Sequence, residues 1–422
     1  MNSFTKTLSQ NMLMFLVLIF PLIFFFRSLA INFVSGLIII FFIIHCSSNF
    51  LTHIKKNRVY LLFFAVIALV FATYIEEGFN LKFLKSLSLI KIPIFFMAVI
   101  YTYKNLFFYK FSTKIIKYII VIFAIFFIDL IYQFIFTENI LGFKAGMCNK
   151  YNECARFSSF FNDEYIAGGY ITLIIIPFFL LINKIYKKKY LMFVPIIILI
   201  LVIITGERTA TILALLFNIF YYSITIKLIR NKLLFFIFLI LGLIIFLNIL
   251  LPDRTASRYK NEIINMSLDD NGDFTFFYNN PWTLHYEASV KIFMDKPFIG
   301  HGLKAFKKKC KKYEYLKEKY SNKYNVCTSH PHNFYLEILN DSGFLGFLFF
   351  VLFFILFTYT KFYKIKISKD NLILIYFIII LFFPRPTGSI FSTYFLHLLI
   401  YSVGMLAGIL DIKENNKYKN EN

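Results

Sequence analysis

The sequence predicts an all-α polytopic membrane protein with about twelve transmembrane helices and one large periplasmic loop. Of its 422 residues, 59% are hydrophobic and 16% are charged, whereas a soluble globular protein has roughly 45–50% apolar and about 25% charged residues. Apolar runs of about 20 residues, the length that crosses a bilayer as a helix, recur along the chain, for example at 115–136 and 233–251. A transmembrane β-barrel would instead show alternating segments of roughly ten residues.

The apolar runs locate the individual spans. We expect transmembrane helices at 9–26, 28–48, 59–75, 86–103, 115–136, 164–183, 190–206, 209–226, 233–251, 344–360, 371–385 and 390–411. Three units follow from this pattern. They are an N-terminal transmembrane bundle of about nine helices (1–251), a large loop (252–332), and a C-terminal unit (333–422) with an amphipathic helix followed by the last spans.

The distribution of Lys and Arg predicts the orientation in the membrane. Short connecting segments on one side carry 22 of these residues and those on the other side carry 8. Because basic short loops stay in the cytoplasm, we expect both termini inside and the 252–332 loop in the periplasm of a bacterial inner membrane. The lysines of this loop do not contradict the assignment, since loops longer than about 60 residues translocate regardless of charge.

Cysteine positions agree with this topology. Cys148, Cys154, Cys310 and Cys327 all fall in segments assigned to the periplasm, where disulfides can form. Of the three connectivities that four cysteines allow, local pairing of Cys148 with Cys154 and of Cys310 with Cys327 is the simplest. The alternative is that these are unpaired thiols.

The most informative segment is 330–346, where the large loop leads into the tenth span. Its polar residues recur at helical spacing and share one face: Asn333, Glu337, Asn340 and Asp341. Gly343 is expected to end this helix, and His332 stands at its start. A histidine there is mostly neutral at pH 7 and can accept a proton, although an arbitrary histidine at such a position more often caps or packs.

The pattern His332-Asn333, nine residues, Gly343-Phe-Leu-Gly346 resembles the signature of the O-antigen ligase and O-antigen polymerase superfamily. Further segments resemble that family in the same order: 127–133, 156–169, 206–211 and 295–302. The resemblance covers roughly residues 125–350.

The resemblance implies a GT-C-type glycosyltransferase of lipopolysaccharide or surface polysaccharide biosynthesis. It would transfer a glycan from an undecaprenyl-diphosphate-linked donor to an acceptor hydroxyl, with lipid A–core as acceptor for a ligase and another glycan for a polymerase. The family's loop histidine corresponds to His332 and its outer-face arginine to Arg208. The arginine at the start of the large loop corresponds to Arg258 or Arg254, with Arg258 preferred.

The remaining expected substrate-binding residues are Arg156, Asn333 and Glu337, with the last two lining the same cleft. An arginine suits a diphosphate because its charge is permanent and its planar fork matches phosphate oxygens. We therefore expect a metal-independent enzyme without a cofactor.

Other interpretations are weaker. A lipid-linked-oligosaccharide flippase or other transporter would favour short outer loops and charged residues within the spans, where this chain has few, such as Lys91 and Asp129. The segment 269–273 opens like a calcium loop, but Asn280 stands where a glutamate is needed. The lysine run at 307–312 predicts a solvated face that could also attract membrane lipid headgroups, and its outer location argues against nucleic acid.

Overall fold

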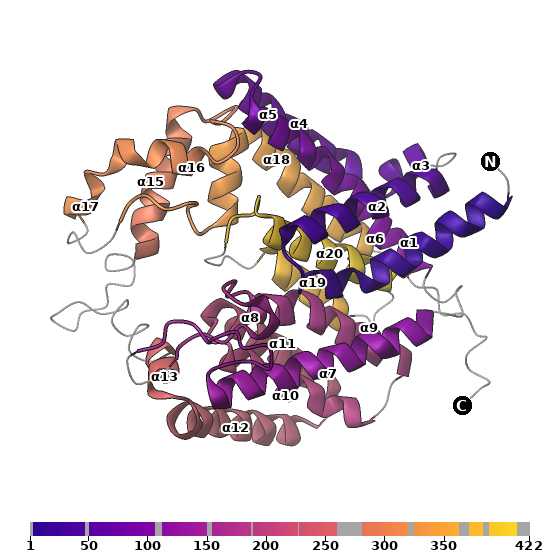
Figure 1. Ribbon diagram of the computed structural model, residues 1–422, viewed down its shortest axis with the longest axis vertical. Coiled ribbons are helices and arrows are strands. Elements are labelled where there is room, and N and C mark those ends of the chain that lie inside the picture. The colour runs from indigo at the N-terminus through magenta and orange to yellow at the C-terminus, as the bar shows by residue number, and fades with distance from the viewer. Residues whose placement is uncertain are drawn as a thin grey trace.

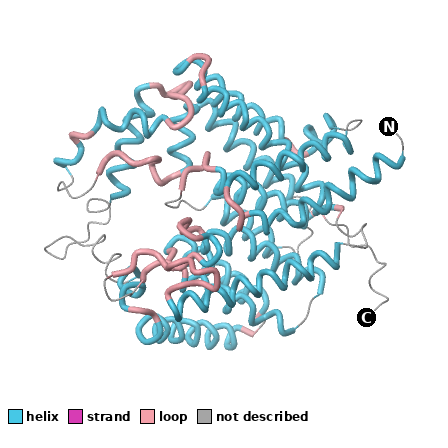
Figure 2. The backbone as a smooth tube through the Cα atoms, viewed as in Figure 1, coloured by secondary structure: helices cyan, strands magenta, loops and turns pink. Residues whose placement is uncertain are grey.

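The protein is described by a computed structural model that covers residues 3–46, 50–105, 112–149, 154–186, 189–226, 228–259, 281–319, 325–362, 371–382 and 388–411. Within these residues the chain is all-helical, with no strand beyond two isolated β-bridges in one loop (Figure 1). The predicted all-α class is therefore confirmed. The longer loops gather at the end of the molecule that carries α13 and α15 (Figure 2).

The helices of the first half of the chain are α1 (Ser3–Ile23), α2 (Ser28–Cys46), α3 (Phe50–Lys56), α4 (Val59–Glu77), α5 (Leu81–Leu87), α6 (Lys91–Lys104), α7 (Ser112–Phe136), α8 (Ala167–Tyr170), α9 (Ile176–Tyr186), α10 (Val194–Ile204) and α11 (Arg208–Thr225). Those of the second half are α12 (Ile229–Ile245), α13 (Asp253–Tyr259), α15 (Pro281–Asp295), α16 (Ala305–Lys309), α17 (Leu316–Lys319), α18 (Phe334–Phe362), α19 (Asn371–Phe382) and α20 (Thr393–Leu410). Short 3₁₀ or π segments lie at Ser88–Ile90, Ser159–Phe161, Ile171–Ile175, Lys189–Phe193, Phe246–Leu250 and Cys310–Tyr313.

Each predicted span contains a helix of the structure. By length and apolar composition, eight helical segments among the described residues can cross a membrane: Ser28–Cys46, Val59–Glu77, Leu81–Lys104, Thr113–Phe136, Ala167–Tyr186, Arg230–Ile249, Phe334–Lys361 and Thr393–Leu410. Three shorter apolar helices accompany them: Thr7–Ile23, Leu191–Ile204 and Leu372–Leu381. A multi-pass membrane protein is thus supported, while the count of about twelve spans and the periplasmic side of the loop stay predictions.

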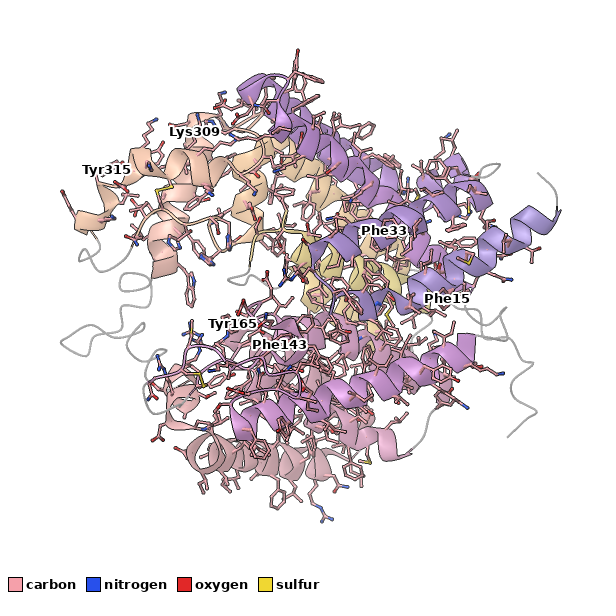
Figure 3. All side chains as sticks on the ribbon, in the orientation of Figure 1. Phe15, Phe33, Phe143, Tyr165, Lys309 and Tyr315 are labelled. Atoms are coloured by element: carbon pink, nitrogen blue, oxygen red, sulfur yellow. A yellow bond between two sulfur atoms is a disulfide. The ribbon has the colours of Figure 1, made fainter. Side chains whose placement is uncertain are left out.

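The outer surface of the bundle is apolar. Phe15 and Phe33 project from α1 and α2 (Figure 3), and Phe33 is 66% exposed. On α12, Phe238 is 69% exposed. Such a surface would be unfavourable in water but is matched by lipid, where the helices satisfy their own backbone hydrogen bonds.

The helices form two groups that meet along α19 and α20 (Figure 1). In one group α4 packs on α18, α1 on α2 and α6 on α20, and in the other α10 packs on α11. Helices α15 and α16 belong to the loop segment and pack on α18. They enclose a small core of their own, formed by Leu284, Ala288, Ile292, Phe306, Cys310, Tyr313, Leu316 and Val326.

Gly343 breaks α18, as the sequence predicts. Its φ is 65° and its ψ is −170°, a conformation open almost only to glycine. The break lets the turn at 297–305 dock against the helix: Phe344 N donates to Pro297 O at 2.7 Å, and a Cβ on Gly343 would lie 2.5 Å from Phe298 C and O. Asp341 completes the joint, because its carboxylate accepts the N–H groups of Lys304 and Ala305 at 2.8 Å each.

The same loop unit is fastened to the end of α4 by ion pairs. Lys296 and Lys309 contact Glu76 at 2.5 and 2.6 Å, and Lys308 contacts Glu77 at 2.5 Å. The lysine run therefore differs from its predicted role as a solvated face: part of it is used for docking, because the 295–312 segment folds back over α4. Lys309 lies at this contact (Figure 3).

Candidate functional site

A cavity of about 740 Å³ opens between the two groups of helices and the loop helices. It is lined by Arg156, Glu164, Tyr165, Ile166, Gly169, Thr172, Leu173, Glu207, Arg208, Thr209, Ala210, Leu213, Arg258, Trp282, Lys304, Ser329, His330, His332, Gly388, Ser389, Phe391, Ser392, Tyr394, Phe395 and Leu398. Four residues singled out in the sequence are thus brought together: Arg156, Arg208, Arg258 and His332. Arg254, Asn333 and Glu337 are not among the lining residues.

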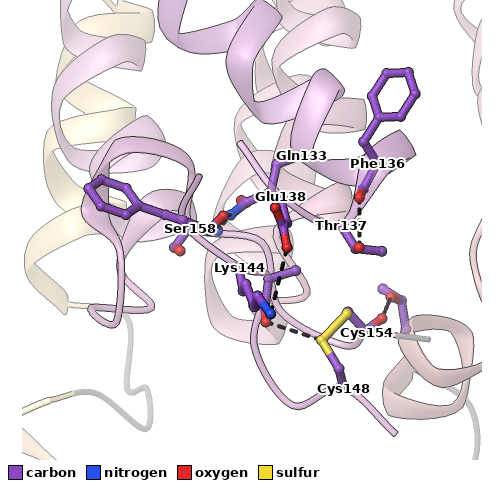
Figure 4. Close-up of a disulfide and its surroundings, with 11 residues drawn as sticks. Gln133, Phe136, Thr137, Glu138, Lys144, Cys148, Cys154 and Ser158 are labelled. Atoms are coloured by element: carbon purple, nitrogen blue, oxygen red, sulfur yellow. Dashed lines mark hydrogen bonds and ion pairs between the residues drawn. A yellow bond between two sulfur atoms is a disulfide. The ribbon is translucent and has the colours of Figure 1, made fainter. Parts of the chain in front are cut away.

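The loop that carries Arg156 is held in place by α7. Asp129 accepts hydrogen bonds from Ile140 N at 2.9 Å and from Asn139 Nδ2 at 3.2 Å. Gln133 Oε1 accepts from Ser158 N at 2.9 Å (Figure 4). Asp129 is therefore a structural anchor within α7. A local disulfide between Cys148 and Cys154 closes the loop just before Arg156.

Arg156 itself is half-buried beside Tyr165. Its Nη2 donates to Tyr165 O at 2.8 Å, and its guanidinium carbon lies 5.2 Å from the centre of the Tyr165 ring. The Tyr165 side chain lies on the face of the α7–α12 group that is turned toward the loop helices (Figure 3). Burial lowers the pKa of Arg156, and the nearby Glu207 carboxylate opposes this shift.

A tight turn at Gly206 presents Arg208 at the start of α11. The φ of Gly206 is 71°, and a Cβ there would lie 2.1 Å from Ala155 O, so only glycine fits. The Arg208 guanidinium lies 5.3 Å from the ring of Trp282, a cation–π contact with α15. The sequence did not single out Trp282, the only tryptophan of the chain.

Glu207 also lines the cavity, near Arg156 and Arg258, and also was not singled out in the sequence. Its carboxylate accepts Gly168 N at 2.7 Å and Gly169 N at 3.2 Å. Burial raises the pKa of Glu207, while Arg156, these two N–H groups and Arg258 act in the opposite direction. A Glu directly before an outer-face arginine was the available signal for this residue, because a cluster of cations needs a counter-charge.

Arg258 reaches the cavity from α13, whereas Arg254, one turn earlier, does not line it. Arg258 Nε donates to Gly206 O at 3.3 Å, which joins α13 to the turn before Arg208. The next residue, Tyr259, donates from its hydroxyl to Ile203 O at 3.0 Å, and burial raises its pKa to about 12.

His332 approaches from the opposite wall, on the segment that precedes α18. Its φ is 55°, which is rare for a residue with a side chain. Its ring centre lies 4.2 Å from that of His330 and 5.3 Å from that of His285. A second disulfide, between Cys310 and Cys327, ties the start of this segment to the loop core.

The comparisons with known proteins agree with this arrangement. The model of the O-antigen ligase family matches residues 192–351, a range that contains Arg208, Arg258 and His332 but not Arg156. Over these residues the chain is similar to the O-antigen ligase family. No curated protein matches the chain significantly.

The predicted resemblance is therefore confirmed for the matched part of the chain. Within the matched range, the residues that line the cavity include Arg208, Arg258, Lys304 and His332.

For Asn333 and Glu337, the prediction that their polar face lines the cleft is wrong. Asn333 Oδ1 caps α18 by accepting Tyr335 N at 3.0 Å and Leu336 N at 3.2 Å. Glu337 is buried and accepts Ser389 Oγ at 2.5 Å and Ile390 N at 2.8 Å. The polar face turns toward neighbouring segments because their backbone donors need buried acceptors, so Glu337 contributes to the cavity by holding the wall that contains Ser389.

The part of the chain that the structure describes contains no group of three or more His, Cys, Asp or Glu residues that could hold a metal ion. The calcium-like segment at 269–273 lies outside the described residues. Lys91, predicted to be charged within a span, donates to Asn32 Oδ1 at 2.7 Å.

Proposed function

We propose that the cavity is the active site of an inner-membrane glycosyltransferase that moves a glycan from undecaprenyl diphosphate to an acceptor hydroxyl on the periplasmic side. The observation that carries this proposal is the convergence of three arginines and His332 on one cavity of about 740 Å³. The arginines come from three separate chain segments and His332 comes from a fourth.

In this proposal Arg208 and Arg258 hold the donor diphosphate. Negative charge grows on the leaving group as the glycosidic C–O bond breaks, and fixed cations aimed at developing charge are a strong catalytic term. Trp282 and the Gly206 carbonyl restrain these two arginines before substrate binds, so little reorganisation is needed. Arg156 adds positive charge to the cavity lining, partly balanced by Glu207.

His332 acts as the general base. The acceptor hydroxyl gives its proton to the neutral imidazole as its oxygen forms the new bond to the sugar carbon, and the electron pair of the old bond leaves with undecaprenyl diphosphate. The charge that a divalent metal offsets in many transferases is here offset by arginine, so the reaction proceeds without a metal. The acceptor is lipid A–core for a ligase and a second lipid-linked glycan for a polymerase.

The test is an assay of purified protein with a lipid-linked donor. His332→Ala should lower the rate about 10²–10⁴-fold, whereas His330→Ala, its neighbour on the same wall, should lose much less. Arg208→Lys keeps the charge but loses the planar fork, so its activity should fall between wild type and Arg208→Ala. Near-normal turnover by His332→Ala would end the assignment of the base, and loss of activity in EDTA restored by magnesium or manganese would overturn the metal-free mechanism.

The lipopolysaccharide banding pattern of a deletion strain identifies the acceptor that the protein uses in cells. Loss of all capped molecules identifies a ligase, and capping with a single repeat unit identifies a polymerase. An unchanged pattern in a strain that makes O-antigen would contradict both acceptors.

A further inference from the structure

One face of helix α15 contacts the segments that carry both proposed catalytic groups. Trp282, His285 and Ser289 are spaced three and four residues apart and therefore share this face. Trp282 lies against Arg208, the His285 ring lies against His332, and Ser289 Oγ accepts Asn340 Nδ2 at 2.6 Å. One rigid helix thus touches α11, the segment before α18, and α18 itself.

The protonation of His285 follows from its hydrogen bond. The side chain is 5% exposed, and its Nε2 lies 3.0 Å from Asn325 O. A carbonyl oxygen can only accept, so Nε2 carries the proton. The buried Nδ1 has no hydrogen-bond partner among the described atoms, and burial lowers the pKa of His285. Burial thus favours the neutral ring, and the bond to Asn325 O acts in the opposite direction.

The segment from Asn325 to His332 is tethered at its start and presents His332 at its end. Cys327 is joined to Cys310, and Val326 is fully buried in the core of the loop helices. His285 contacts both ends, because it bonds Asn325 O and stacks on the His332 ring at an interplanar angle of 24°. With His332 at a strained φ of 55°, this stacking is a contact that can fix the direction of its ring.

We propose that His285 is a positioning residue for His332: its ring sets the orientation of the His332 imidazole, and its Nε2–H latches the segment that carries it. The inference rests on the proposed role of His332 as base. A neutral His285 ring is compatible with this role. A protonated His285, with its ring centre 5.3 Å from that of His332, would disfavour the protonated His332 that forms during the reaction.

The other charged groups near His332 come from several elements. His330 is on its own segment, Lys304 is on the turn before α16, and Arg208, Glu207 and Arg258 are on the opposite wall of the cavity. The proposal concerns ring geometry and needs no titration of these groups.

The experiment compares His285→Phe, which keeps an aromatic ring but lacks the donor, with His285→Gln, which keeps a donor but lacks the ring. His301→Phe is the matched control, because His301 is also buried in the loop unit, also has its Nε2 3.0 Å from a carbonyl oxygen, that of Ile292, and does not line the cavity. The measurements are kcat and KM with the lipid-linked donor, the unfolding temperature, and the state of the Cys310–Cys327 disulfide.

We expect His285→Gln to lower kcat by about 10–100-fold, the size of effect that misplacing a catalytic group by about 1 Å produces, with KM nearly unchanged. His285→Phe should retain more activity than His285→Gln because it preserves the stacking. In a His332→Ala background, neither substitution should lower the residual rate further, since a positioning residue acts only through the group it positions.

Additive losses in the double variants would overturn the proposal, as would near-wild-type kcat in both single variants. A collapse of the unfolding temperature in both, but not in His301→Phe, would show that His285 serves the fold and not the base. The failure of the proposed function is distinct: there, His332→Ala itself retains activity whatever the His285 variants do.

Discussion

The two arginines of α13 offer an internal comparison at the candidate site. Arg254 and Arg258 are separated by one helical turn, and Arg258 lines the cavity while Arg254 does not. The substitutions Arg254→Ala and Arg258→Ala remove the same charge from the same short helix and change its helix propensity equally. Because Arg258 also donates to Gly206 O, unfolding temperatures are needed to separate the loss of this contact from the position of the guanidinium relative to the cavity.

The expected magnitudes follow from the contacts. A hydrogen bond between charged groups contributes about 1.5–3 kcal/mol, so removing the Arg258 fork from a diphosphate should lower kcat/KM by about 10–150-fold. The kcat/KM of Arg254→Ala should stay within about 2.5-fold of the wild-type value, which corresponds to about 0.5 kcal/mol. Arg258→Ala also loses the bond from Nε to Gly206 O at 3.3 Å, which should cost about 0.5–1.5 kcal/mol of folding stability.

The assay is glycan transfer by purified variants at saturating and limiting donor, with thermal unfolding in the same detergent. Arg258→Lys serves as the test of geometry, because it restores the charge without the planar fork and should recover only part of the activity. If Arg254→Ala is the more damaging substitution, or if the two are equal, the assignment of Arg258 to the donor diphosphate is refuted.

Two further predictions concern the fold and the topology. Gly343→Ala should lower the free energy of unfolding by about 1–3 kcal/mol more than Gly78→Ala. Both glycines have a φ near +65° and an extended ψ, but only at Gly343 would the new Cβ meet the Phe298 backbone, at 2.5 Å. Equal unfolding temperatures of the two variants would contradict the docking of the 297–305 turn. Alkaline phosphatase fused after Lys312 should be active and fused after Lys366 inactive, since the Lys and Arg asymmetry predicts opposite sides of the membrane, and the reverse pattern would reject the periplasmic active site.

Local features were predictable from the sequence alone. The apolar runs located a helix at each expected span, because hydrophobic length is a property of a contiguous segment. The break at Gly343 was also predicted, since glycine is a local helix stop. His332 was selected through a motif with fixed spacing and Arg208 through the resemblance of the 206–211 segment, which is again information along the chain.

Contacts between distant segments were decided only by the tertiary structure. The sequence left Arg254 and Arg258 open because their difference depends on which side of α13 faces the Gly206 turn, 52 residues from Arg258. It also gave no reason to select His285, whose importance comes from stacking on a histidine of another segment.

Glu337 is the converse case, a residue that the sequence selected for the cavity and that the tertiary structure places elsewhere. Its helical spacing predicted the polar face correctly, yet that face turns toward Ser389 and Ile390, 52 and 53 residues away, and not toward the cavity. Periodicity determines which residues share a face of a helix, because it depends on the helix alone. What that face meets depends on how all the helices pack, and here the buried backbone N–H of Ile390 required an acceptor that only Glu337 provides in the described structure.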